Sequence, residues 1–154
     1  MPLTFAYGSN MCVADMFSRA PGSKLLGAAR LQKFRFALLP DGFATLARDP
    51  AAVTHGVLWD LSFAALAALD RYEGEGYDKV LLPVIREKGG AARALVYIAP
   101  PTANAGRAPP DYMEKIAAAA TAHGLPRAHV DLLRACGGLP PEAPPKLRAI
   151  KGKI

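Results

Sequence analysis

The fold is decided near the N-terminus, where residues 3–10 read LTFAYGSN. The apolar half of this segment predicts a short buried strand over residues 3–7. Gly8 breaks the strand, and a short helix is predicted over residues 11–19. A tight turn of small polar residues is therefore expected between the first strand and the first helix.

Further along the chain, the sequence predicts short strands interrupted by helices. Strands are predicted over residues 25–31, 34–39, 43–47, 53–61, 80–86 and 93–98, with a loop at 50–52. Helices are predicted over residues 63–71, with Ser62 as N-cap, and over 111–122 and 126–136. Many of these short strands follow one another directly and are expected to form hairpins, which argues against a parallel βαβ sheet. The expected fold class is α+β, with a curled and partly closed sheet.

The length of 154 residues is that of one domain. We expect this domain over residues 1–138, followed by a Pro-rich basic tail over residues 139–154. Residues 144–154 supply +4 of the net charge of +6, and the preceding chain shows no basic stripe with interleaved aromatics. We therefore interpret the tail as solvated and expect no nucleic-acid binding. Binding of nucleic acid through the tail is the alternative, and it would weaken steeply with salt.

Membrane association and metal binding are not expected either. No run approaches the roughly 20 apolar residues that span a bilayer. The N-terminal residues MPLT lack the basic region of a secretory signal, so a cytoplasmic protein is expected. Cys12 and Cys136 lack CxxC spacing, and the three histidines lack metal-binding spacing. A Cys–His nucleophilic pair stays open. We interpret Cys12 as a small buried hydrophobe, and Trp59 and Phe63 as core residues.

The turn at residues 7–10 has the composition of an anion-binding loop. A glycine followed by small polar residues, just before a helix, can point several backbone amides at a substrate carboxylate. The alternative is that Ser9 or Asn10 merely caps the following helix.

Glu73 lies at the end of a predicted helix, among glycines and aromatic residues. The negative end of the helix dipole disfavours its charge, and an apolar wall would raise its pKa further. A carboxyl group in that position can move protons near neutral pH. The alternative is that Glu73 and Glu75 are both solvated surface residues.

Four segments, in this order, resemble the γ-glutamylcyclotransferase family. They are FAYGSNM (5–11), ARLQKFRF (29–36), GVLWDL (56–61) with LDRYEG (69–74), and PPDYMEKI (109–116) followed by Gly124-Leu125-Pro126. The resemblance covers about residues 3–136. Its last segment is more similar to the stand-alone γ-glutamylcyclotransferases than to the shorter AIG2-like relatives.

This resemblance implies a small mixed, mostly antiparallel β-barrel flanked by helices. It implies that Glu73 is the catalytic acid and base, without metal or organic cofactor, and that Glu75 is a surface residue. The residues that it assigns to substrate binding are Tyr7, Gly8, Ser9, Asn10, Met11 and Tyr112.

The reaction implied by the resemblance converts a γ-glutamyl amino acid to 5-oxoproline and a free amino acid. The α-amine of the substrate attacks its own γ-carbonyl, so the enzyme needs no nucleophile. The expected partner is a small-molecule γ-glutamyl substrate. Two alternatives stay open: the same chemistry on a γ-glutamylamine or another γ-glutamylated metabolite, and a non-catalytic ligand-binding module on the same scaffold. Whether the chain forms a homodimer also stays open.

Overall fold

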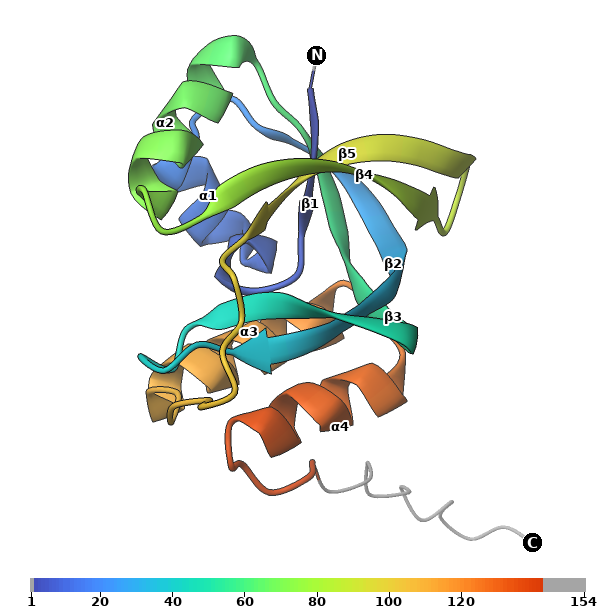
Figure 1. Ribbon diagram of the computed structural model, residues 1–154. Coiled ribbons are helices and arrows are strands. Elements are labelled where there is room, and N and C mark those ends of the chain that lie inside the picture. The colour runs from blue at the N-terminus through green and yellow to red at the C-terminus, as the bar shows by residue number, and fades with distance from the viewer. Residues whose placement is uncertain (1, 143–154) are drawn as a thin grey trace, which may run out of the picture.

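The computed structural model describes residues 2–142, and its centre is a closed five-stranded barrel (Figure 1). The strands are β1 (Leu3–Ala6), β2 (Lys24–Leu38), β3 (Ala44–Asp60), β4 (Asp78–Arg86) and β5 (Gly90–Ile98). Their order around the barrel is β1-β3-β2-β4-β5. Neighbours are antiparallel except β1 and β5, which close the barrel as a parallel pair at Thr4 and Leu95. The expected mixed, mostly antiparallel barrel with flanking helices is confirmed.

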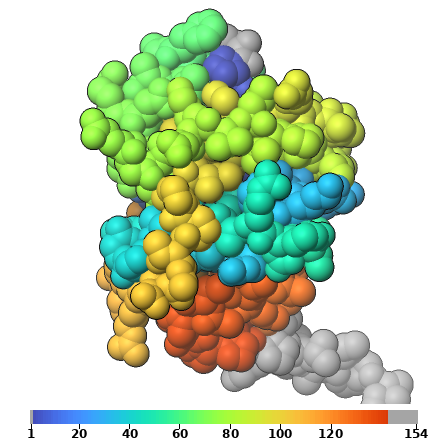
Figure 2. All heavy atoms as spheres, in the orientation of Figure 1, coloured from blue at the N-terminus to red at the C-terminus, as the bar shows by residue number. Residues whose placement is uncertain are grey.

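Helices lie in two groups around the barrel. The helical elements are a 3-10 turn η1 (Ser9–Met11), α1 (Val13–Arg19), α2 (Phe63–Glu73), α3 (Pro110–Ala122) and α4 (Arg127–Cys136). Figure 1 shows α1 beside α2 near one end of the barrel, whereas α3 and α4 lie against the far part of the β2–β3 hairpin. The loop over residues 99–109 joins the two regions and crosses the face seen in Figure 2. Within residues 2–142, no helix combines the length and apolarity needed to cross a membrane.

The long β2–β3 hairpin differs from the sequence prediction. Residues 25–31 and 34–38 belong to one strand, β2, rather than to two, and residues 50–52 lie inside β3 rather than in a loop. The register shifts at Lys33, whose φ is 71°, so that Gln32 pairs with Val53 and Phe34 with Arg48. This bulge takes Pro50 out of the regular ladder, in which a proline has no N–H to donate.

Two predictions about the helices are also wrong. The first α-helix begins at Val13 and not at residue 11, because residues 9–11 form the separate turn η1. Phe63 is 77% exposed, because the buried face of α2 is made by Ala65 and Leu69 instead. The placement of Trp59 in the core is confirmed, since its side chain is fully buried.

Close packing between β1 and β3 positions the turn that follows β1. A Cβ atom on Gly56 would lie 2.2 Å from the carbonyl oxygen of Ala6 and 2.8 Å from the ring of Phe5. Only glycine permits this approach. The end of β1 is therefore pressed against β3, and the chain leaves the barrel at a fixed place.

Beyond α4, the chain turns back onto the helix. The amide of Leu139 donates to the carbonyl of Arg134 at 2.8 Å, and Arg134 Nε donates to the carbonyl of Pro140 at 2.7 Å. The predicted basic tail begins here, but residues 143–154 lie outside the described part of the chain.

Candidate active site

The turn between β1 and α1 is held firmly through its carbonyl groups. Within the turn, the amide of Met11 donates to the carbonyl of Gly8 at 3.0 Å. From outside it, Trp59 Nε1 donates to the carbonyl of Asn10 at 3.0 Å, and His123 Nε2 donates to that of Met11 at 2.6 Å. The carbonyls of Asn10 and Met11 are thus fixed from β3 and from the end of α3.

The amides of the same turn remain available. Among residues 2–142, the backbone N–H groups of Gly8, Ser9 and Asn10 donate to no other group of the protein. Three adjacent amides without an internal acceptor can bind an anion or a developing oxyanion. The turn therefore has the donor groups expected of the predicted anion-binding loop.

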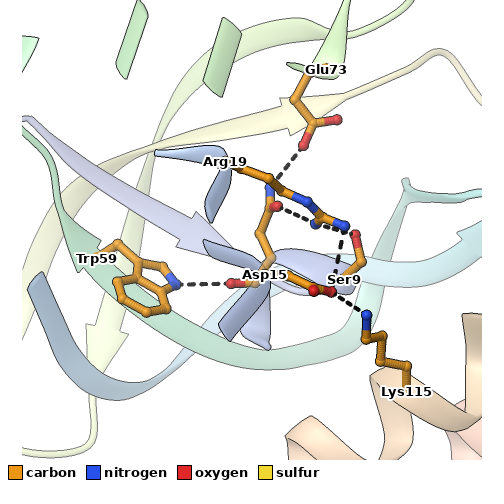
Figure 3. Close-up of polar contacts among 7 residues, drawn as sticks. Ser9, Asp15, Arg19, Trp59, Glu73 and Lys115 are labelled. Atoms are coloured by element: carbon orange, nitrogen blue, oxygen red, sulfur yellow. Dashed lines mark hydrogen bonds and ion pairs between the residues drawn. The ribbon is translucent and has the colours of Figure 1, made fainter. Parts of the chain in front are cut away.

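Glu73 lies opposite this turn, at the last position of α2. Asn10 Nδ2 donates a hydrogen bond of 2.7 Å to Glu73 Oε1. Neither Ser9 nor Asn10 caps α1, whose N-cap is Cys12 without a side-chain hydrogen bond. The alternative reading of Ser9 and Asn10 as caps is therefore wrong, because Arg19 Nη1 binds Ser9 Oγ and Asn10 Oδ1, both at 2.9 Å (Figure 3).

Burial controls the charge of Glu73. Loss of solvent raises the pKa of this carboxyl above its ordinary value, while the Asn10 hydrogen bond and the positive charge of Arg19 partly oppose the shift. Glu75, two residues later, is exposed. The two carboxylates thus have different environments, and only Glu73 faces the turn.

A cavity lies between Glu73 and the turn. Its inner part has a volume of about 50 Å³ and its outer hollow about 560 Å³. Ser9, Glu73, Tyr77 and Tyr112 line both parts. The outer hollow adds charged residues of both signs, which are Arg19, Asp41, Asp111 and Lys115.

Four tyrosines line the inner cavity, and three of them donate their hydroxyl protons to the protein. Tyr7 donates to the carbonyl of Tyr97 at 2.5 Å, Tyr97 donates to Asp70, and Tyr77 donates to the carbonyl of Ala44 at 2.7 Å. Tyr112 differs, because its hydroxyl oxygen accepts a hydrogen bond of 3.0 Å from the Ala44 amide. Within the described residues, the Tyr112 hydroxyl proton has no acceptor.

These phenols stay protonated across the neutral range. Burial raises the pKa of Tyr7, Tyr77 and Tyr97 far above the ordinary value, and that of Tyr112 to about 12. The nearby carboxylate of Glu73 acts in the same direction. Among the groups that line the inner cavity, the phenols therefore keep their protons, and Glu73 is the one suited to carry a proton.

The structure brings most of the predicted site residues together. The cavity lining includes Tyr7, Gly8, Ser9, Asn10, Glu73 and Tyr112. Met11 is not in the lining, and its side chain is fully buried in the core. Neither Cys12 nor Cys136 lines either part of the cavity. Among residues 2–142, no group of three or more His, Cys, Asp and Glu side chains is placed to hold a metal ion.

Sequence reasoning missed Arg19 and Tyr97. Arg19 lies in the last turn of α1, nine residues after Asn10, and the sequence of this helix does not indicate which residue the Arg19 side chain contacts. Tyr97 lies in β5, where an apolar strand pattern does not separate a core tyrosine from a cavity tyrosine. No local signal could have found either residue, because the contacts depend on how the helices pack on the barrel.

Comparison with known proteins identifies the family of this chain. The family model described as Gamma-glutamyl cyclotransferase, AIG2-like matches residues 4–115. A relative named Gamma-glutamylcyclotransferase, from Homo sapiens, is 28% identical over an alignment of 152 residues, and the match covers 86% of this chain and 77% of the relative.

Solved structures have the same fold. One named Gamma-glutamyl cyclotransferase is 25% identical, with a TM-score of 0.81 over 97% of this chain and 94% of its own length. YkqA from Bacillus subtilis is 22% identical, with a TM-score of 0.74 over 92% of this chain and 56% of its own, and this likeness concerns the fold alone. The chain therefore belongs to the gamma-glutamyl cyclotransferase, AIG2-like family and is an enzyme of the gamma-glutamylcyclotransferase type.

Proposed function

We propose that the protein converts a γ-glutamyl amino acid to 5-oxoproline and a free amino acid, with Glu73 as the group that moves the protons. One observation carries the proposal. The half-buried carboxylate of Glu73 and the free amides of the turn at residues 8–10 line one cavity, joined by the 2.7 Å hydrogen bond from Asn10. A proton carrier and an anion site thus face each other.

The reaction is a ring closure within the substrate. Glu73 takes a proton from the α-ammonium group, and the neutral amine attacks the γ-carbonyl, forming a new C–N bond. The tetrahedral intermediate then collapses: Glu73 returns its proton to the leaving nitrogen as the bond to that nitrogen breaks, and the ring nitrogen gives up its second proton, which the departing amine carries away as an ammonium group. No water is consumed, and one carboxyl group serves as base and then as acid. Because the reacting groups are already tethered, the enzyme mainly has to hold the chain folded.

The cavity supplies the remaining interactions. The amides of Gly8, Ser9 and Asn10 bind the substrate carboxylate or the developing oxyanion. Tyr112 donates its unused hydroxyl proton to a substrate oxygen. The other buried phenols exclude water and remain neutral, so they add no charge beside Glu73. Since the inner cavity is small, the leaving amine lies in the outer hollow.

The test is incubation with γ-glutamyl-alanine and measurement of 5-oxoproline. Glu73→Gln should keep the fold and ligand binding but lose turnover by at least the roughly 100- to 10,000-fold that general acid–base catalysis provides. Glu75→Gln is the matched control, because the same change is made at an exposed carboxylate two residues away. Near-normal activity of Glu73→Gln would remove Glu73 from the mechanism, and a large loss in Glu75→Gln would show that the wrong carboxylate was chosen.

A panel of leaving groups separates this proposal from the alternatives. The outer hollow carries Asp41 and Asp111 as well as Arg19 and Lys115, so its charges do not select an amino acid over a γ-glutamylamine. The proposal requires turnover of γ-glutamyl dipeptides. Turnover confined to γ-glutamylamines or to glutathione would assign another leaving group, and binding without turnover would indicate a ligand-binding module.

A further inference from the structure

Asn10 is bound on both sides by groups of fixed hydrogen-bonding character. Arg19 Nη1 lies 2.9 Å from Asn10 Oδ1, and Asn10 Nδ2 lies 2.7 Å from Glu73 Oε1. A guanidinium group has only donors, so the amide atom that faces it must be the oxygen. The amide nitrogen is thereby turned toward Glu73, where it can only donate.

Arg19 is itself held in place by several contacts. It forms an ion pair of 3.5 Å with Asp15, its Nη1 also donates to Ser9 Oγ, and its guanidinium lies 4.1 Å from the ring centre of Tyr72. Its side chain is only 16% exposed. Asp15 also binds Lys115 of α3 at 2.6 Å, so the guanidinium is fixed from two helices (Figure 3).

We propose that Arg19 is a positioning residue, which fixes the orientation of the Asn10 amide and thereby holds Glu73 with Oε1 bound and Oε2 free to exchange a proton with the substrate. The inference rests on the proposed function, because it takes Glu73 as the proton carrier. Asn10 cannot accept a proton from Glu73 in this orientation. The proton that Glu73 takes up therefore resides on Oε2, and no side-chain contact within the described residues competes for it.

Within residues 2–142, the one other cation in the lining around Glu73 is Lys115, which is paired with Asp15. From the remaining elements, the neighbours of its carboxyl group are the neutral phenols Tyr7, Tyr77, Tyr97 and Tyr112. The outer hollow adds Lys115, which is bound to Asp15, and the carboxylates Asp41 and Asp111. Arg19 is the cation that lowers the pKa of Glu73 against the effect of burial.

Arg19→Met tests this assignment, because methionine keeps the apolar stem without donors or charge. The Asn10 amide is then free to turn, and Glu73 loses a positive neighbour. We expect kcat to fall about 10- to 100-fold, the range for one hydrogen bond to a charged group, with KM changed less than about threefold. Since removal of the cation raises the pKa of Glu73, the acid limb of the kcat/KM profile should move to higher pH.

Arg19→Lys and Arg93→Met are the companion variants. Lysine keeps the charge and a donor, so it should restore most of kcat and return the acid limb toward its wild-type position. Arg93 is exposed on β5 and lines no part of the cavity, so Arg93→Met removes the same charge without kinetic effect. A loss in Arg19→Met that lysine does not rescue, or that leaves the acid limb unmoved, would reduce Arg19 to a structural residue.

A second readout needs no turnover. The ¹³C resonance of the Glu73 side-chain carboxyl, assigned by its absence in Glu73→Gln, reports the titration of this group in the free protein. In Arg19→Met it should titrate at higher pH than in wild type, and Asn10→Ala should shift it in the same direction. An unchanged titration in both variants overturns the positioning role.

Failure of the proposed function has a different signature. If wild-type protein releases no 5-oxoproline, or if Glu73→Gln remains active, the catalytic role of Glu73 is wrong. The carboxyl titration still decides whether Arg19 and Asn10 control Glu73. In the kinetic assay, Arg19→Met should lower kcat far less in the Asn10→Ala background than in the wild-type background, because Arg19 acts on Glu73 through the Asn10 side chain that this background lacks.

Discussion

Tyr112 is the residue whose hydroxyl is used differently from those of the other cavity tyrosines. Its oxygen accepts from the Ala44 amide, which leaves its proton for the substrate. We predict that Tyr112→Phe lowers kcat/KM with γ-glutamyl-alanine about 10- to 100-fold, the value of a hydrogen bond to a charged or developing charged group. Steady-state kinetics measures the loss.

Tyr77→Phe is the matched control, since the hydroxyl of Tyr77 donates to the carbonyl of the same residue, Ala44. This variant should lose about 1 kcal/mol of unfolding free energy and much less activity than Tyr112→Phe. Equal kinetic losses in the two variants would show that Tyr112 acts through packing and not through its proton.

At the scale of single residues, local chemistry made Glu73 and the turn at residues 8–10 candidates, because one lies at a helix end among glycines and aromatics and the other has a composition that suits an anion. It left open the alternatives of a solvated glutamate and a helix cap, and the resemblance to the family selected these residues. Arg19 could not be selected, because its role depends on the 2.9 Å contact with Asn10 and on the packing of its guanidinium group against Tyr72 from another helix. Whether each residue of the cavity binds substrate stays a prediction.

Among the secondary-structure elements, α2 carries Glu73 at one end and its cap at the other. Ser62 Oγ accepts a hydrogen bond of 3.0 Å from the Ala65 amide, as the sequence predicted. We predict that Ser62→Ala lowers the unfolding free energy by about 1 kcal/mol, the usual value of an N-cap. Urea denaturation measures this change. The kcat of the folded variant should stay within about twofold of the wild-type value, because fraying of the first helical turn stops well before Glu73. A large fall in kcat would show that α2 moves as one rigid body.

Errors in the predicted elements arose where one local signal had two structural solutions. Pro50 and its alanines suggested a loop, but a bulge around Lys33 lets the proline remain within β3. Phe63 is apolar and begins a helix, yet the first turn of α2 turns this ring outward. Neither choice could be made from sequence, because each depends on the partner strand or on the surface that the helix covers.

At the scale of the whole molecule, β3 and α4 are joined by a pair of histidines. The rings of His55 and His129 lie 5.2 Å apart, and His129 is only 5% exposed, with an Nε2 atom that has no partner within the described residues. Burial lowers the pKa of His129 from 6.5 to about 4, and the neighbouring His55 adds to the shift. His129 is therefore neutral in the folded protein at neutral pH.

This pair predicts a loss of stability in mild acid. Unfolded protein binds a proton at His129 from about pH 6.5 downward, whereas folded protein resists protonation until about pH 4. The stability contributed by neutral His129 is therefore fully present above about pH 6.5, and it is lost as the pH falls from about 6.5 to about 4. The full difference between the two pKa values of His129 corresponds to about 3 kcal/mol of unfolding free energy. Chemical denaturation at about pH 7.5 and about pH 4.5 should show a smaller fall in unfolding free energy for His129→Gln than for wild type. Equal falls would exclude His129 as the source.

Closure of the barrel is the feature of the whole molecule that local patterns could not supply. Alternating residues predicted the strands and their hairpins, and these imply a curled sheet. The parallel contact of β1 with β5 joins residues far apart in the chain through one register pair. The expectation of a full barrel came from the resemblance of four motifs, and the structure confirmed it.

Trp59 gives the enzyme a built-in optical reporter. It is the single tryptophan of the chain, it is fully buried, and its indole N–H is bonded to the carbonyl of Asn10. Indole emission responds to the field along that bond. A molecule seated on the amides of the same turn will therefore change the fluorescence of the protein, so binding can be followed in real time without a label, even in a variant that has lost all turnover.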